Sequence, residues 1–350
     1  SPALRKMGSR IRQGLDVVAG DPRFRQEVDG AMDLLGKADV TGFSDAVVAH
    51  TSQLLTNEFH AAPEPPPQEG KSDMPSSLWE ALLGSGKDPE VELVKWLREG
   101  APTGFDDSNP IVANGIFPPT SGPTAAVEAS KTFAEVKCKF DPAEHNNYRS
   151  YYEHEELSED EVSRPVKLSY IEIVLTWVLI LSRWSYAVAT RLASIVKTKA
   201  DGSLKLRFVM DLLRSGVNGR SNPPERIVLP RITDYVTSVL NLMVALWLQG
   251  GDQAAVNMVT LMVVDFSDAF YNLHARPAER GWLIFRCKQG WAVFKRICFG
   301  MTTAPLLWVG WLRPPAEFPK LLSYPMSFVS RYTWTIRLWW WPAPRRKDGA

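Results

Sequence analysis

The chain has 350 residues, enough for two or three domains, and its hydrophobic fraction of 45% is ordinary. The net charge of +1 conceals a division, because residues 1–190 carry 18 Lys and Arg against 29 Asp and Glu, whereas residues 191–350 carry 22 against 10. A basic half joined to an acidic half is expected when only the basic half binds a polyanion, although a chance distribution over two domains gives the same division.

Simple patterns argue against zinc binding, secretion and membrane insertion. The three cysteines form no Cys-x-x-Cys pair and the five histidines lack metal-ligand spacing, which indicates a reducing compartment and no zinc. The first residues carry no hydrophobic signal core, so we expect a cytoplasmic or nuclear protein that is not secreted. The most apolar stretch has an uncharged run of only ten residues, 173–182, which is too short to span a bilayer.

The first half is expected to be helical and rich in linkers. Residues 1–60 suit either a docking unit or a small helical spacer, since apolar positions recur at helical spacing. The three segments with this spacing are Ile11–Val18, Val28–Leu35 and Phe43–Leu55. Residues 61–77, with a Pro-Glu-Pro-Pro-Pro run, predict an extended linker. Residues 78–165 combine a helix over Glu90–Glu99 with low-complexity sequence.

Regular patterns are interrupted and then resume in the second half. The apolar run Leu168–Tyr186 has neither strand alternation nor clean helical spacing, so it is either a buried helix or sequence that does not belong to the fold. Two strand-like runs then flank Asp201-Gly202, and this dipeptide predicts a β-hairpin, here a basic one. An apolar-periodic helix follows over Tyr235–Leu248.

A carboxylate-bearing stretch comes next. The β-formers Val263 and Val264 run directly into Asp265, and Asp268 follows beside aromatic residues. This pattern suits a buried strand whose C-terminal end holds a divalent metal in a cleft. Two short strands, Trp282–Arg286 and Trp291–Arg296, are predicted downstream. They lead into Cys298–Pro305, which reads Cys-Phe-Gly-Met-Thr-Thr-Ala-Pro.

In this order, the hairpin, the Asp265 stretch and the Phe-Gly-x-x-x-Ala-Pro stretch resemble the fingers hairpin and two palm motifs of reverse transcriptases. The Phe-Gly form is similar to that of retroviral-type, long-terminal-repeat and tyrosine-recombinase retroelements. The resemblance covers about a third of the chain, roughly residues 190–308. It implies an α+β fold, an incomplete right-hand polymerase of fingers and palm preceded by the helical, linker-rich region. It also implies an RNA template, a DNA primer and a deoxynucleoside triphosphate as partners.

The resemblance assigns roles to individual residues. Asp265 and the backbone carbonyl of Phe266 would hold Mg²⁺ in a two-metal centre for nucleotidyl transfer. Lys199 and Arg207 would grip the triphosphate of the incoming nucleotide, because cations neutralise a leaving pyrophosphate.

Further roles concern the rest of the nucleotide pocket. Phe270 would lie under the deoxyribose and exclude a 2′-hydroxyl, and Gly300 would let the backbone approach the nucleotide or template. Asp268 would either line the pocket or cap the following turn. Asp211, Arg214 and Asn218 would mainly hold the shape of the hairpin.

The chain departs from the family after Trp308. The Tyr-x-Asp-Asp hairpin that supplies the remaining metal ligands is missing. Because tryptophan has the single codon TGG, the frame that begins at each third base can be read across Arg331–Pro342. It gives hydrophobic-(Tyr or His)-x-Asp-(Asp, Asn, His or Tyr), and later Val-Val-Ala. We therefore predict a frameshift between about Trp308 and Tyr332, an out-of-frame tail over residues 309–350, and no polymerase activity for the chain as written.

Two other functions remain open from the sequence. The chain is alternatively a non-catalytic remnant that binds nucleic acid through the basic hairpin, or a helical interaction protein whose motif matches are coincidental. A polymerase activity that needs Asp265 separates the first alternative from an enzyme. The absence of a hairpin at Asp201-Gly202 would favour the second.

Overall fold

The structure is a computed structural model. It describes residues 13–14, 16–34, 44–86, 91–113, 115, 117–120, 140–221, 223–228, 231–248 and 268–310. The chain forms two compact units, one of residues 1–227 and 270–324, the other of residues 228–269 and 325–350. Helices and strands are both present, in agreement with the expected α+β class.

The first part of the larger unit is helical. Its helices are α2 (Pro22–Leu34), α3 (Asp45–Glu58), α4 (Ser76–Gly86) and α5 (Val91–Glu99). Ser44 caps α3 by accepting a hydrogen bond from the backbone N–H of Val47 at 3.3 Å. Helices α4 and α5 pack together through buried leucines such as Leu83 and Leu97. Helix α5 ends at Glu99 as predicted, whereas α4 lies where no helix was predicted.

The run Leu168–Tyr186 belongs to the fold, so the interpretation that it is foreign to the fold is wrong. It forms strand β1 (Ile171–Val174) and the short helix α9 (Trp177–Arg183). The other interpretation, a buried helix, is wrong as well, because Ile180 is fully buried while Val178 is 75% exposed. The pattern was unclear because a four-residue strand and a two-turn helix are too short for either period to show.

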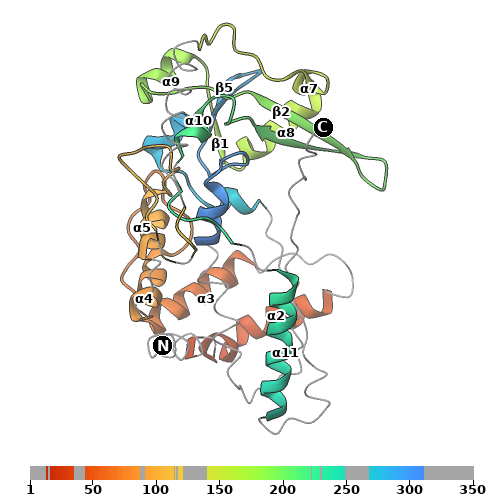
Figure 1. The fold of residues 1–350 in the computed structure, drawn as a ribbon. Coiled ribbons are helices and arrows are strands. Elements are labelled where there is room, and N and C mark those ends of the chain that lie inside the picture. Colours follow the sequence, from red (N-terminus) through yellow and green to blue (C-terminus); the bar gives the residue numbers. More distant parts are fainter. Residues whose placement is uncertain are drawn as a thin grey trace. The chain divides into compact units, whose positions relative to one another are not determined.

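Two small sheets follow. Strands β4 (Ile284–Cys287) and β5 (Gly290–Phe294) are the two predicted strands, and β1 pairs antiparallel with β5 to give the order β1-β5-β4. The core beside this sheet includes Ile180, Trp184 and Trp291. Strands β2 (Leu192–Thr198) and β3 (Leu204–Met210) form the predicted hairpin, and Figure 1 shows it as a long two-stranded ribbon with α7 (Arg149–Tyr152) and α8 (Glu155–Lys167) beside its base.

Later in the chain are the short helix α10 (Val217–Arg220) and two 3₁₀ helices, η2 (Ala269–Asn272) and η3 (Pro277–Trp282). In the smaller unit, α11 spans Ile232–Leu248, close to the predicted helix. Its apolar residues Ile232, Val236, Leu240 and Val244 recur every four residues and are more than half exposed. None of the helices in the described ranges is long and apolar enough to cross a membrane.

Candidate functional site

The hairpin turn is fixed by the residues that predicted it. Gly202 has φ +81°, a conformation that side chains disfavour. The carboxylate of Asp201 accepts hydrogen bonds from the backbone N–H and the hydroxyl of Ser203, at 2.9 and 2.6 Å. These bonds also lower the pKa of Asp201. The turn holds Lys199 at the end of the ribbon, where its backbone N–H donates to the carbonyl of Ser203.

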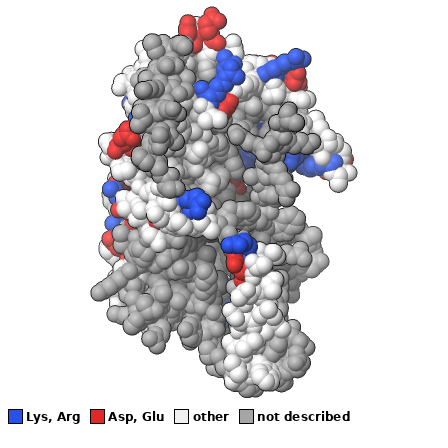
Figure 2. Space-filling view, viewed as in Figure 1, with Lys and Arg blue, Asp and Glu red and all other residues white. Residues whose placement is uncertain are grey.

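The two faces of the hairpin differ in character. One face is buried and includes Leu192, Leu206 and Met210. On the other face, the cross-strand pairs are Ala193 with Val209, Ile195 with Arg207, and Lys197 with Lys205. Figure 2 shows lysine and arginine side chains on the projecting hairpin at the right of the view. Lys197, Lys205 and Arg207 therefore give this face a basic character.

A cavity of about 560 Å³ lies at the base of this face. The Ala193–Val209 pair lines the cavity. Arg207 belongs to the next pair on the same face, roughly 7 Å further along the ribbon. The other wall is the start of α7, which runs along the free edge of β2. There the backbone N–H of Tyr148 donates to the carbonyl of Leu192 at 3.1 Å.

Tyr148 is held over the cavity by a polar contact that the sequence did not reveal. Its hydroxyl donates to the carboxylate of Asp211, and burial together with this bond raises the pKa of Tyr148. The same carboxylate accepts from the backbone N–H of Arg214 at 3.0 Å. Asp211 therefore shapes the end of the hairpin, in agreement with the expectation. The tyrosine and its neighbours Arg149 and Ser150 carry no motif, so only the tertiary contact identifies them.

Gly300 forms part of the cavity and lies against β3. Its φ is +106°, and a Cβ at this position would overlap the carbonyl oxygen of Met210. Because Gly300 has no side chain, residues 298–303, which we call the Phe-Gly loop, can approach the backbone of the hairpin. Asn218 joins the same loop, since its Nδ2 donates to the Gly300 carbonyl at 2.8 Å and its Oδ1 accepts from the backbone N–H of Thr302 at 3.1 Å.

Phe299, the residue before this glycine, belongs to a group of aromatic rings. Phe270, on η2, contacts Phe299 with ring centroids 4.9 Å apart, and the ring of Trp308 is 6.4 Å from Phe270. Phe299 is 47% exposed. A helix begins shortly after it at Ala304, with Pro305 in the first turn. Of the predicted nucleotide-binding residues, Gly300 lines the cavity, Arg207 lies on the next pair of the same face, and Phe270 contacts the neighbour of Gly300, whereas Lys199 lies at the far end of the ribbon.

The predicted metal ligands, Asp265 and Phe266, lie outside the described residues. Asp268 belongs to the smaller unit, with φ +53° directly before η2. The described ranges contain no group of three His, Cys, Asp or Glu side chains suited to a metal. Among the cavity residues the one carboxylate is Asp211, which Tyr148 and Arg214 already engage. These residues do not fit a two-metal centre.

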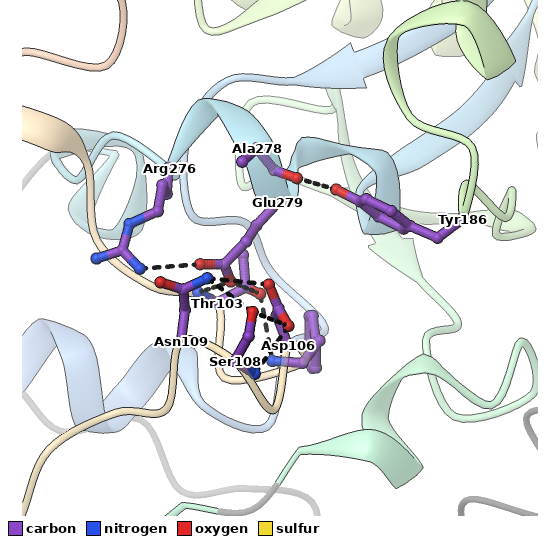
Figure 3. Close-up of polar contacts among 9 residues, drawn as sticks. Thr103, Asp106, Ser108, Asn109, Tyr186, Arg276, Ala278 and Glu279 are labelled. Carbon is purple, nitrogen blue, oxygen red and sulfur yellow. Dashed lines mark hydrogen bonds and ion pairs between the residues drawn. The ribbon is translucent and has the colours of Figure 1, made fainter.

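A buried polar network surrounds Glu279 (Figure 3). The carboxylate of Glu279 accepts from the backbone N–H and the hydroxyl of Thr103, at 2.7 and 2.6 Å, and Arg276 lies 3.4 Å from its other oxygen. Burial raises the pKa of Glu279. Figure 3 also shows Tyr186 bonded to the carbonyl of Ala278, at the start of η3 next to Glu279.

No protein-family model matches the chain, and no curated protein is significantly similar to it.

Proposed function

We propose that this chain carries the fingers and part of the palm of a retroelement reverse transcriptase. One observation carries the proposal: the hairpin and the loop of residues 298–303, far apart in sequence, meet around one cavity beside a basic face, and Phe270 of η2 contacts Phe299 of that loop. These are the segments that the resemblance assigns to nucleotide binding. A phosphate chain suits the basic face, and a base or sugar suits the apolar and aromatic surface.

The chain binds nucleotide and nucleic acid without polymerising. Two-metal nucleotidyl transfer needs several carboxylates around the cations, and this sequence offers Asp265 but no Tyr-x-Asp-Asp hairpin. The tail over residues 309–350 is read in a shifted frame. The parent enzyme uses Asp265 and the Phe266 carbonyl for Mg²⁺, with an RNA template, a DNA primer and a deoxynucleoside triphosphate as its substrates.

The test measures binding of dTTP and of an RNA–DNA template-primer by the full chain. Arg207→Ala is expected to weaken dTTP binding about tenfold, because it removes a cation from the face that receives the phosphates. Arg183→Ala is the matched control, since this arginine lies on α9 and pairs with Glu172 at 2.9 Å. Equal affinity of the wild type and Arg207→Ala for dTTP would refute the assignment.

Sequencing of the transcript across the codons for Trp308 to Pro342 tests the parent enzyme. An open third-base frame that encodes Tyr-x-Asp-Asp supports a polymerase whose reading frame has shifted. A closed frame, or a fifth position other than Asp, leaves the non-catalytic nucleic-acid-binding remnant as the better candidate. Absence of a hairpin at Asp201-Gly202 would have favoured a helical interaction protein. The hairpin is present, so this alternative gains no support from it.

A further inference from the structure

Residues 101–105, which we call the strap, follow helix α5 and lie against the segment 274–276. The backbone N–H of Ala101 donates to the carbonyl of His274 at 2.7 Å, and the N–H of Arg276 donates back to Ala101 at 3.0 Å. Gly100, with φ +91°, makes this approach possible, because a Cβ there would lie 2.8 Å from the backbone nitrogen of Arg276. The strap is therefore bonded like a strand to a segment more than 170 residues away.

Thr103 connects the strap to the Phe-Gly loop. Its N–H and hydroxyl both donate to Glu279, while its carbonyl accepts from the hydroxyl of Thr303 at 2.6 Å. Thr103, Glu279 and Thr303 are all fully buried. A buried donor or acceptor that loses its partner is costly, so these bonds define one position for Thr303. Gly104 adds a close contact, because a Cβ on it would lie 2.9 Å from Cγ2 of Thr303.

Thr303 follows Gly300 by three residues, so the loop is fixed from two directions. Asn218 bonds Gly300 and Thr302 from the hairpin side, and Thr103 bonds Thr303 from the side of the strap. Loss of the bond to Thr103 leaves residues 300–303 held mainly from the side of Asn218, where the hydroxyl of Ser221 also lies 2.6 Å from that of Thr302. The position of Gly300 against Met210, and with it the shape of the cavity, then depends on both.

We propose that the strap positions the nucleotide site, with Thr103 and Thr303 as the positioning residues. The acidic N-terminal region thus forms part of the binding module, although it contributes no residue to the motifs. The expected effect on nucleotide affinity rests on the proposed function, whereas the expected effect on the loop does not. An experiment can therefore test the positioning of the loop separately from nucleotide binding.

Hydrogen exchange of the full chain without ligand tests the positioning. Thr303→Val keeps the shape of the side chain and removes its hydrogen bond to the strap, and Thr103→Val removes one bond to Glu279. We expect exchange of the amides of residues 300–303 to become at least about tenfold faster in both variants, while those of β2 and β3 keep their rates. Thr103→Ser, which keeps the hydroxyl, should restore slow exchange.

Ser158→Ala provides the control for a purely structural effect. It removes a buried hydroxyl that bonds the Tyr151 carbonyl at 3.1 Å and Ser194 at 2.8 Å. This variant should lower the melting temperature and leave exchange of residues 300–303 unchanged. Unchanged exchange of these residues in the valine variants, or an equal increase throughout the larger unit, would overturn the proposal.

Two further arms complete the design. If the valine variants do not fold, Gly104→Ala replaces them. Its Cβ would crowd Ile111 and Thr303 at a backbone with φ +78° without removing a side-chain hydrogen bond, and it must give the same local increase. With dTTP as the probe, Thr303→Val should weaken binding about fivefold at a temperature well below its melting point. If the wild type binds no dTTP but the exchange result holds, the proposed function fails and the positioning stands.

Discussion

At the scale of single residues, the structure predicts a large effect of replacing Gly300. An alanine there would be strained by φ +106° and would overlap the Met210 carbonyl, so we expect Gly300→Ala to lower the free energy of unfolding by about 2–4 kcal/mol. Gly202→Ala is the matched control, because Gly202 also has positive φ but open space around it. It should cost about 1 kcal/mol. Urea unfolding measures both, and equal losses would contradict the contact with Met210.

His145 makes the stability of the fold depend on pH. Burial lowers its pKa to about 4, and the nearby Arg191 and Arg286 act in the same direction. In the unfolded chain the histidine pKa is about 6.5, so the unfolded state takes up a proton that the folded state does not. The contribution of His145 to the free energy of unfolding is therefore fully present above pH 6.5 and is lost as the pH falls toward 4.

Urea midpoints between pH 7 and pH 4 measure this effect. His145→Phe should flatten the decline, and part of it should remain because burial also lowers the pKa of His274, to about 3. A variant whose midpoint falls as steeply as that of the wild type would exclude His145 as the cause.

At the scale of elements, α9 depends on a single buried side chain. Ile180 is 0% exposed within the core cluster, so Ile180→Ala should lower the free energy of unfolding by about 2–4 kcal/mol. Val178→Ala, on the exposed side of the same helix, should change it by less than about 0.5 kcal/mol. Thermal or urea unfolding compares the two. Similar effects of both replacements would show that the helix is not anchored through Ile180.

The elements that could be predicted are those with a complete local signal. Asp201-Gly202 specifies its own turn, strands β4 and β5 are adjacent in sequence, and α11 is long enough to show its period. The elements that were missed depend on distant partners. Strand β1 is recognisable only through β5, which lies about 120 residues later.

The same distinction applies to the candidate site. Arg207, Phe270 and Gly300 follow from motifs, because each motif has a fixed local spacing. Tyr148 and Thr103 carry no such pattern, and their relation to the site comes from hydrogen bonds to Asp211 and Thr303. A tertiary hydrogen bond requires no repeating pattern of residues in either of the segments that it joins, so it cannot be recognised from the sequence.

At the scale of the whole molecule, the uneven charge predicts how binding responds to salt. Affinity for a template-primer should fall steeply as the salt concentration rises, because phosphate contacts release counterions. Lys197→Glu/Lys205→Glu should weaken binding and flatten this dependence. Lys95→Glu/Lys167→Glu makes the same change of charge on α5 and at the end of α8, and should have little effect. Electrophoretic mobility shifts at several salt concentrations measure the slope, and equal slopes would argue against the hairpin as the binding surface.

The strap also bears on how the protein is made. A ribosome adds roughly 5–20 residues each second, so Thr103 is added about 10 to 40 s before Thr303. During this interval the backbone groups that later bond to residues 274–276 have only water or chaperones as partners. The first half of the chain therefore cannot complete its own fold during translation, and a nascent chain arrested before Glu279 would be a substrate for the quality-control proteases of its cell.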